Sequence, residues 1–246
     1  MIVRTDALVL RAMDYSETSR IATLLTRQHG AIGVVAKGAR RPTSRFGSTL
    51  QPGAYVQAVY YYRPNRGLQT LKEASHLARF PHLGTDLERG TVAFRLLEVT
   101  RALVGEDDPH PLALEAVVRA LTYADVADRP RSAIPWLQLR LATLLGFAPD
   151  VDREALDALP DEGGVLHLAT GQAAEIGLGG PTFRASRAAL RAFAVFARVD
   201  LETAARMRLT PEVRAEVEAL ADAYLRLHSD DTVPDRVRRV TDQFDV

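Results

Sequence analysis

The sequence predicts an α+β protein, with a small β-barrel at the N-terminus and an α-helical bundle after it. Residues 1–80 contain short apolar and β-branched segments separated by turn-forming residues, a pattern typical of strands. From residue 81 onward, apolar residues recur with a helical period, except in a glycine-rich interval at 148–184. We therefore predict a barrel domain at 1–80 and a helical domain at 81–246, interrupted by a small, irregular, hairpin-bearing insertion at 148–184.

Four or five short strands are expected in the N-terminal domain. One of them alternates clearly, so that Val56, Ala58, Tyr60 and Tyr62 share one face while Tyr61 lies on the other. The segment RPNRG then forms a turn, which lets the next strand return as an antiparallel partner. Strands of this number and length predict a small closed barrel of the oligonucleotide-binding (OB) type. The expected strands lie within 3–13, 20–26, 31–36, 54–62 and 68–74.

The expected helices have recognisable ends. Thr85 precedes Glu88 by three residues, the spacing of a capping box, and Thr210 with Pro211 is typical of an N-cap followed by the first helical residue. The first three helices would form a bundle against which the barrel packs, and residues 230–246 are expected to be a frayed helix or disordered. The expected helices lie within 85–105, 111–127, 133–147, 184–200 and 210–228.

Composition excludes several classes of protein. The chain has no Cys, so it has neither disulfides nor thiolate metal sites. It has neither an apolar run long enough to span a membrane nor an N-terminal secretion signal, which predicts a cytoplasmic protein without a membrane partner. The motifs of phosphate-binding loops, nucleotide-binding folds, serine hydrolases and zinc proteases are absent, and the six His residues are scattered. The pairs Asp107/Asp108 and Asp230/Asp231 fit solvated loops or helix ends, so we expect no enzyme.

Charge is unevenly distributed along a chain whose net charge is zero. Residues 1–80 contain 12 Lys and Arg against 4 Asp and Glu, a net charge of +8, and the remainder contains 19 against 27, a net charge of −8. The segment KGARRPTSRFGS at 37–48 contains four basic residues and no acidic one. Basic side chains on a glycine-flanked loop can follow a phosphate backbone, because neutralising phosphates releases counterions. This pattern predicts that the N-terminal domain binds a polyanion.

Aromatic residues lie next to this positive charge. Phe46 follows Arg45, and Tyr61 lies in a run of three tyrosines shortly before Arg63 and Arg66. Single-stranded nucleic acid stacks its bases on such rings, with a contribution of ~1–3 kcal/mol per base whatever the sequence. In the alternative interpretation, Phe46 and one or two of the tyrosines belong to the barrel core and the arginines form a solvated rim. We favour nucleic-acid binding.

The segment DYSETSRIATLLTRQHGAIGVVAKGARRPTSRFGSTLQP, residues 14–52, resembles the N-terminal signature of the RecO family of bacterial recombination mediators. In that family a D-Y-x-E-x-x-R-I stretch precedes a K-G-x-R-R-x-x-S-R-F loop. The order of barrel, helices, insertion and helices is also similar. The residues that match the family's basic loop, and are therefore expected DNA contacts, are Lys37, Arg40, Arg41, Ser44 and Arg45. Arg20 and Tyr15 match the preceding motif. Four further expected contacts come from the pattern of the residues alone, namely Phe46, Tyr61, Arg63 and Arg66.

The resemblance implies a non-enzymatic, nucleoid-associated DNA repair protein. Family members bind single- and double-stranded DNA, anneal complementary strands and act with RecR, and often RecF, to load RecA onto DNA coated with single-strand-binding protein. They also bind the acidic, apolar tail of single-strand-binding protein. For that tail we expect a cationic, apolar groove within 134–147, where Leu139 and Leu141 flank Arg140.

The sequence departs from the family at a metal site. Many members bind zinc with two C-x-x-C pairs in the insertion, whereas this chain has Glu154 and Asp157 at the first pair and His167 and Thr170 at the second. Thr is not a zinc ligand, so we expect the metal to be lost and no cofactor to be bound. The apolar residues of the insertion, namely Val165, Leu166, Leu168 and Ile176, are expected to form a small core instead.

Two other functions remain open from the sequence. The chain could be a general single-stranded DNA- or RNA-binding OB protein without mediator activity. It could also be a scaffold whose basic loop docks an acidic protein surface.

Overall fold

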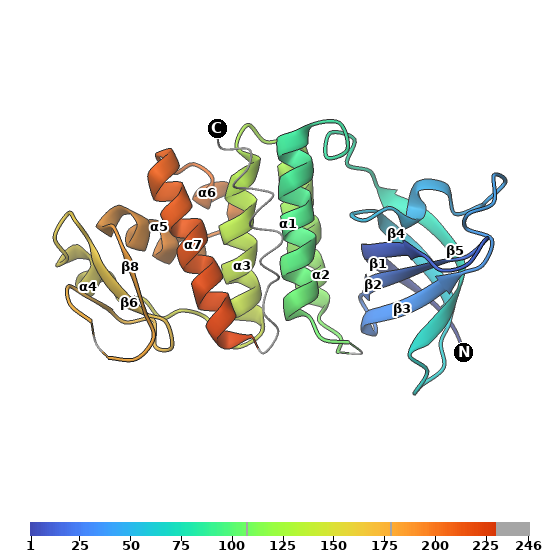
Figure 1. Cartoon of the computed structure of the whole chain (residues 1–246), viewed down its shortest axis with the longest axis horizontal. Coiled ribbons are helices and arrows are strands. Elements are labelled where there is room, and N and C mark those ends of the chain that lie inside the picture. The colour runs from blue at the N-terminus through green and yellow to red at the C-terminus, as the bar shows by residue number, and fades with distance from the viewer. Residues whose placement is uncertain (107, 178, 230–246) are drawn as a thin grey trace. The chain divides into compact units, whose positions relative to one another are not determined.

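The computed structural model describes residues 1–106, 108–177 and 179–229, and it divides into two compact units, Met1–Val126 and Ala127–Val246 (Figure 1). The sequence placed a domain boundary at 80/81, where strands give way to helices. The first unit also includes the two helices that follow the barrel. The predicted tail at 230–246 and the residues Asp107, Asp230 and Asp231 lie outside the described residues.

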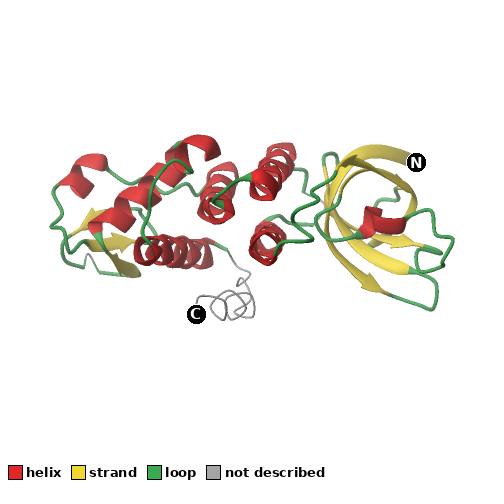
Figure 2. Cartoon of the chain, turned by 90° about the horizontal axis from the view of Figure 1, so that it is seen from above, coloured by secondary structure: helices red, strands yellow, loops and turns green. Residues whose placement is uncertain are grey.

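Five strands form a closed barrel in the order β1-β2-β3-β5-β4, and Figure 2 shows this barrel with the short 3-10 helix η1 (Gly47–Leu50) beside it. The β3–β5 pair is parallel and the other pairs are antiparallel. This arrangement confirms the predicted OB barrel. The strands are β1 (Ile2–Asp14), β2 (Arg20–Thr26), β3 (Gly30–Ala36), β4 (Tyr55–Tyr61) and β5 (Leu68–Ala78).

Apolar side chains at alternate positions of the strands fill the interior of the barrel. Val56, Ala58 and Tyr60 of β4 share one face, as predicted, and this face points into the core together with Leu24 of β2 and Leu71 of β5. Each buried large side chain contributes roughly 1.5–3 kcal/mol relative to an exposed one, so this row stabilises the barrel without any cross-link.

Two helices, α1 (Leu87–Leu103) and α2 (Pro111–Val126), pack against the outer face of β1 and β2. That face carries Leu8 and Leu25, which lie outside the barrel core and are nevertheless fully buried. Arg27 of the β2–β3 turn donates to Glu115 of α2 at 2.8 Å, and this hydrogen bond raises the pKa of the guanidinium.

The start of α1 differs from the predicted one. The N-cap is Asp86, whose side chain accepts a hydrogen bond from the backbone N–H of Arg89 at 2.9 Å. The hydroxyl of Thr85 donates instead to the carbonyl groups of Pro81 and His82, because residues 81–85 already form a turn before the helix. The capping box predicted for Thr85 and Glu88 is therefore wrong by one position.

The second unit has a core between α3 (Ala133–Leu144), α5 (Arg187–Arg198) and α7 (Pro211–His228). Its fully buried side chains include Leu137 and Phe193. Thr210 caps α7 by accepting a hydrogen bond from Val213, and Pro211 is the first helical residue, as predicted. The remaining helices of this unit are η2 (Pro130–Ser132), α4 (Arg153–Asp157) and α6 (Leu201–Ala204).

The glycine-rich interval contains antiparallel strands, as the predicted hairpins require, and is more regular than expected. It contains α4 and an antiparallel three-stranded sheet in the order β7-β6-β8, made of β6 (Gly164–His167), β7 (Ala173–Ala174) and β8 (Thr182–Ala185). Gly163 has a φ of +94°, and a Cβ atom there would lie 2.0 Å from the carbonyl oxygen of Ala185. Glycine at this position therefore lets β6 and β8 come close enough to pair.

Candidate nucleic-acid interface

The basic segment forms a loop between β3 and η1 that is folded into successive turns. The backbone N–H of Arg41 donates to the carbonyl of Gly38 at 3.2 Å, and that of Ser44 donates to the carbonyl of Arg41 at 2.9 Å. Gly38 has a φ of +74°, which a residue with a side chain rarely adopts. These turns leave Lys37, Arg40, Arg41 and Arg45 exposed on one short loop.

Arg40 anchors this loop to the β1–β2 turn. Its guanidinium donates to the carbonyl of Ser16 at 2.6 Å and lies 3.2 Å from a carboxylate oxygen of Asp14. Its backbone N–H donates to the carbonyl of Thr18 at 3.0 Å. Arg20 donates to the same Asp14 at 3.0 and 3.1 Å, so one carboxylate neutralises part of the charge of both arginines. Arg40 thus holds the loop against the β1–β2 turn, while Arg20 joins the two ends of that turn.

Three cations of the loop have no such acidic neighbour. Lys37, Arg41 and Arg45 are exposed and form no ion pair with any residue that the structure describes. Because their charge is not compensated locally, they are the groups of this loop that are free to meet an external anion. The sequence does not distinguish them from Arg40.

Phe46 belongs to the barrel core. Its side chain is 2% exposed and packs within the buried cluster, and the guanidinium of Arg45 lies 5.3 Å from the centre of its ring. A buried ring has no free face for a base, which corrects the predicted stacking role. The Oγ of Ser44 accepts a hydrogen bond from the N–H of Phe46 at 3.2 Å, so this hydroxyl also takes part in the loop's own structure.

A second basic turn connects β4 and β5. Arg63 and Arg66 are exposed, and their backbone is fixed by the buried Gln69, which donates to their carbonyl oxygens at 3.1 and 2.7 Å. Asn65 at the tip has a φ of 61°. The fixed turn leaves both guanidinium groups in solvent.

The three tyrosines at the end of β4 have different environments. Tyr60 is fully buried, Tyr61 is 44% exposed, and Tyr62 is half-buried. The ring of His29 stacks on Tyr62 with a centroid distance of 3.9 Å, and its Nδ1 lies 2.7 Å from the hydroxyl of Tyr60. Sequence reasoning missed His29, because nothing local relates it to residues more than 30 positions away. Tyr15, in the β1–β2 turn, is 63% exposed.

The predicted partner groove within 134–147 is not formed. Leu139 and Leu141 are fully buried in the core of the second unit, and of the three named residues Arg140 is the exposed one. Helix α3 packs against both α5 and α7, so apolar residues occur on more than one of its faces. Its leucines therefore contact other helices rather than solvent.

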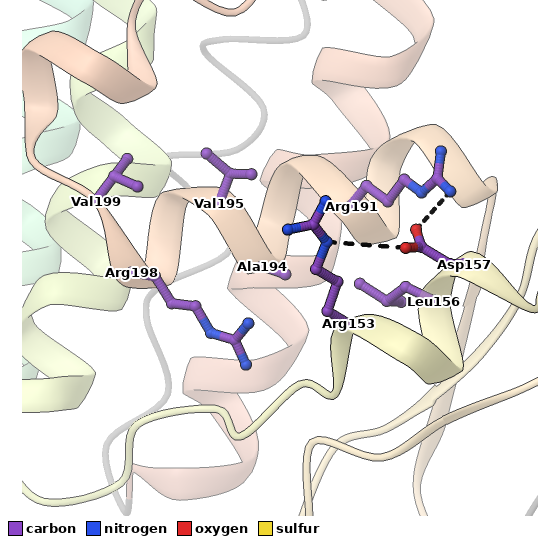
Figure 3. Close-up of a pocket in the computed structure, with 8 residues that line it drawn as sticks. All are labelled: Arg153, Leu156, Asp157, Arg191, Ala194, Val195, Arg198 and Val199. Atoms are coloured by element: carbon purple, nitrogen blue, oxygen red, sulfur yellow. Dashed lines mark hydrogen bonds and ion pairs between the residues drawn. The ribbon is translucent and has the colours of Figure 1, made fainter.

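A cationic pocket with an apolar floor lies instead between α4 and α5. Figure 3 shows its three arginines together with the smaller apolar side chains of α4 and α5, and its volume is about 610 Å³. Arg191 donates to Asp157 at 2.6 Å, and Arg198 donates to the carbonyl of Val151. The sequence signal was the seven-residue spacing of two arginines along α5, which puts both on one side of the helix. The lining residues are Arg153, Leu156, Asp157, Arg191, Ala194, Val195, Arg198 and Val199.

The residues at the family's zinc positions have other contacts. Glu154 and Asp157 lie on α4, where Asp157 pairs with Arg191. The Nδ1 of His167 accepts a hydrogen bond from the N–H of Thr170 at 3.2 Å. Within 1–106, 108–177 and 179–229, no three His, Asp or Glu residues are grouped closely enough to hold a metal ion. These contacts do not fit a zinc site.

The small core of the insertion contains three of the four predicted residues. Val165, Leu166 and Leu168 are buried, whereas Ile176 is 76% exposed and is therefore not part of it.

In the part of the chain that the structure describes, no helix has the length and apolarity needed to cross a membrane.

Comparison with known proteins identifies the family. Residues 1–80 match the family model "Recombination protein O N terminal", and residues 84–236 match "Recombination protein O C terminal". The chain is 50% identical to the DNA repair protein RecO of Salinibacter ruber, over 99% of this chain and 95% of the relative. It is 30% identical to the RecO proteins of Exiguobacterium sibiricum and Chloroherpeton thalassium, over 99% of this chain and at least 98% of each relative. The chain, with its OB barrel and its helical C-terminal region, therefore belongs to the RecO family of DNA repair proteins.

Proposed function

We propose that this protein is a non-catalytic recombination mediator that binds DNA through the loop between β3 and η1. It binds single- and double-stranded DNA, anneals complementary strands, and acts with RecR to load RecA onto DNA coated with single-strand-binding protein. The observation that best supports DNA binding is the set of exposed, uncompensated cations Lys37, Arg41 and Arg45, on a barrel of a DNA repair family.

The geometry of the loop suits a sequence-independent anion site. Arg40 fixes the loop to the β1–β2 turn before any ligand binds, so little conformational entropy is lost on binding. Phosphates then displace counterions from the three free cations, which makes affinity depend steeply on salt and weakly on base sequence. Positive charge also reduces the repulsion between two strands, which favours annealing.

The function is tested by a strand-annealing assay on DNA that has been coated with single-strand-binding protein, with and without RecR. We expect faster annealing with this protein and RecR-dependent loading of RecA. Binding of bare single strands without annealing or loading would instead identify a general DNA- or RNA-binding OB protein. Binding of protein partners with no affinity for DNA would identify a docking scaffold.

We further propose that the α4–α5 pocket binds the acidic, apolar tail of single-strand-binding protein. Arg191 and Arg198 line this pocket, and Val195, which also lines it, lies between them along α5 (Figure 3). An apolar side chain of the tail would fill the floor while its carboxylates meet the guanidinium groups.

A labelled tail peptide tests this assignment. The substitution pair R191Q/V195S should weaken binding at least about tenfold, whereas R206Q/R208Q, which removes two exposed charges of the same unit, should leave it unchanged. Equal affinities of the two variants would place the tail elsewhere.

A further inference from the structure

A groove of about 480 Å³ lies in the first unit, between the end of β5 and helix α1. Residues of η1 and of the segment 51–54, which joins η1 to β4, also line it. Its lining is mainly apolar and contains one cationic side chain and no carboxylate. The volume lies within the range of about 300–1,000 Å³ that is typical of small-molecule sites. We call it the β5–α1 groove.

A half-exposed aromatic ring lines this groove. Phe94 of α1 is 50% exposed, whereas Ala93 and Leu97, which line the groove from the same helix, are buried. A phenyl ring with a free face offers a nucleobase a stacking partner, and such stacking strengthens binding about 5- to 150-fold per base. The groove therefore has an apolar floor with an aromatic side chain that a planar ligand can reach.

A hydroxyl group faces the same groove with its hydrogen available. The Oγ of Ser48 lies 2.9 Å from the Nε2 of His76, whose Nδ1 is buried without a hydrogen-bond partner among the described residues. An N–H at Nδ1 would be buried without an acceptor, so the ring hydrogen is assigned to Nε2, which donates to the hydroxyl oxygen. Burial, and then the charge of Arg79, lower the pKa of His76, so this imidazole is neutral at neutral pH. The hydroxyl of Ser48 is thus free to donate to a base oxygen or ring nitrogen.

The groove continues from the basic loop. Ser48 follows Arg45 by three residues, so their Cα atoms are at most about 11 Å apart. Arg79, which follows β5 and lines the groove, is exposed and forms no ion pair with a described residue. A strand whose phosphates meet Arg45 is therefore close enough to place a base in the groove and a neighbouring phosphate on Arg79.

We propose that the β5–α1 groove binds one unpaired base of the strand held by the loop between β3 and η1. Phe94 stacks on the base, Ser48 donates a hydrogen bond to its edge, and Arg79 meets an adjacent phosphate. This inference rests on the proposed DNA-binding function, and the position of the groove directly after the loop favours a base over a peptide side chain as its occupant. A base in a duplex must be unstacked and unpaired before it can enter such a site. The groove therefore favours single strands over duplexes, whereas the cations of the loop contact phosphates that both contain.

The diagnostic variant is Phe94→Ala, measured by fluorescence anisotropy with a labelled oligothymidylate of about 10 nucleotides, within the ~4–16 that one OB fold covers. Its affinity should fall at least about fivefold because one stacked base is lost. The salt slope and the affinity for a duplex of the same length should not change, since no phosphate contact is removed. Leu87→Ala is the matched control, because Leu87 is an exposed apolar residue of the same helix that does not line the groove.

A strand in which abasic sites replace every base separates stacking from phosphate contact. The wild type and Phe94→Ala should bind this strand equally, which also shows that the variant is folded. Gly84→Leu provides a second variant. Gly84 lines the groove, and a Cβ atom there would meet no atom within 4 Å, so a leucine can occupy the groove without displacing its surroundings. This variant should reproduce the loss of affinity for the oligothymidylate.

Several outcomes overturn the inference and leave the proposed function intact. These are wild-type affinity of Phe94→Ala and Gly84→Leu for the oligothymidylate, an equal loss in Leu87→Ala, or an equal loss on the abasic strand, which would mean that no base is held in the groove. Loss of RecR binding with unchanged DNA binding would indicate a protein-docking groove. If the unmodified protein binds no oligonucleotide, the proposed function itself fails.

Discussion

The charge that the loop between β3 and η1 offers to DNA can be measured from the salt dependence of binding. The perturbation is K37Q/R41Q/R45Q, which removes the three cations of this loop that form no ion pair with a described residue and leaves Arg40 on Asp14 and Ser16. For single strands, log affinity falls with log salt by about 0.7 per phosphate contact, so three contacts give a slope of about −2.1. The wild-type affinity due to this loop should fall about 20-fold between about 50 and 200 mM salt.

The variant should lose this contribution. We expect its affinity to be about 500-fold below wild type at about 50 mM salt and about 30-fold below at about 200 mM, because counterion release matters less as salt rises. Fluorescence anisotropy with a labelled oligothymidylate, titrated at four or more salt concentrations, measures both the affinity and the slope.

Arg40→Gln provides the contrast. Arg40 braces the loop, so its loss should lower the melting temperature and the affinity while changing the slope by less than one contact, about 0.7. The reasoning is refuted if the triple variant keeps the wild-type slope, or if Arg40→Gln changes the slope as much as the triple variant does.

Three further predictions concern stability, each measured by urea unfolding. Phe46→Ala should cost about 3–5 kcal/mol because it leaves a cavity in the barrel core, whereas a surface residue would cost far less. Asp125 accepts hydrogen bonds from the N–H groups of His82 and Leu83 at 2.8 and 3.0 Å, so Asp125→Ala should cost about 2 kcal/mol, and a neutral result would contradict this role. Burial raises the pKa of Tyr224 to about 12, above the usual 10.0, so the folded state favours the protonated phenol. Stability should therefore be full below pH 10 and decline by up to about 2.7 kcal/mol as the pH rises towards 12, and Tyr224→Phe should show a weaker decline.

Local patterns were sufficient for most of the fold. The alternation of Val56, Ala58 and Tyr60 depends on the two-residue period of a strand, and the Thr210–Pro211 start of α7 depends on groups within one helical turn. Such signals act over a few residues and can be read directly. The start of α1 was misplaced by one residue because Thr85 and Asp86 are both good caps, and the turn at 81–85 decides between them.

For the candidate site too, local patterns predicted one part and the tertiary structure decided the other. The sequence alone determined that the N-terminal 80 residues are basic, that they form a barrel, and that one loop concentrates the charge. Only the tertiary structure decided which cations are free, because Arg20 meets Asp14 as its partner across the β1–β2 pair and Arg40 reaches the same carboxylate from a separate loop. It also decided that Phe46 is core and that Leu139 and Leu141 are buried. Burial and ion pairing depend on neighbours that are distant in the chain, whereas composition and periodicity do not.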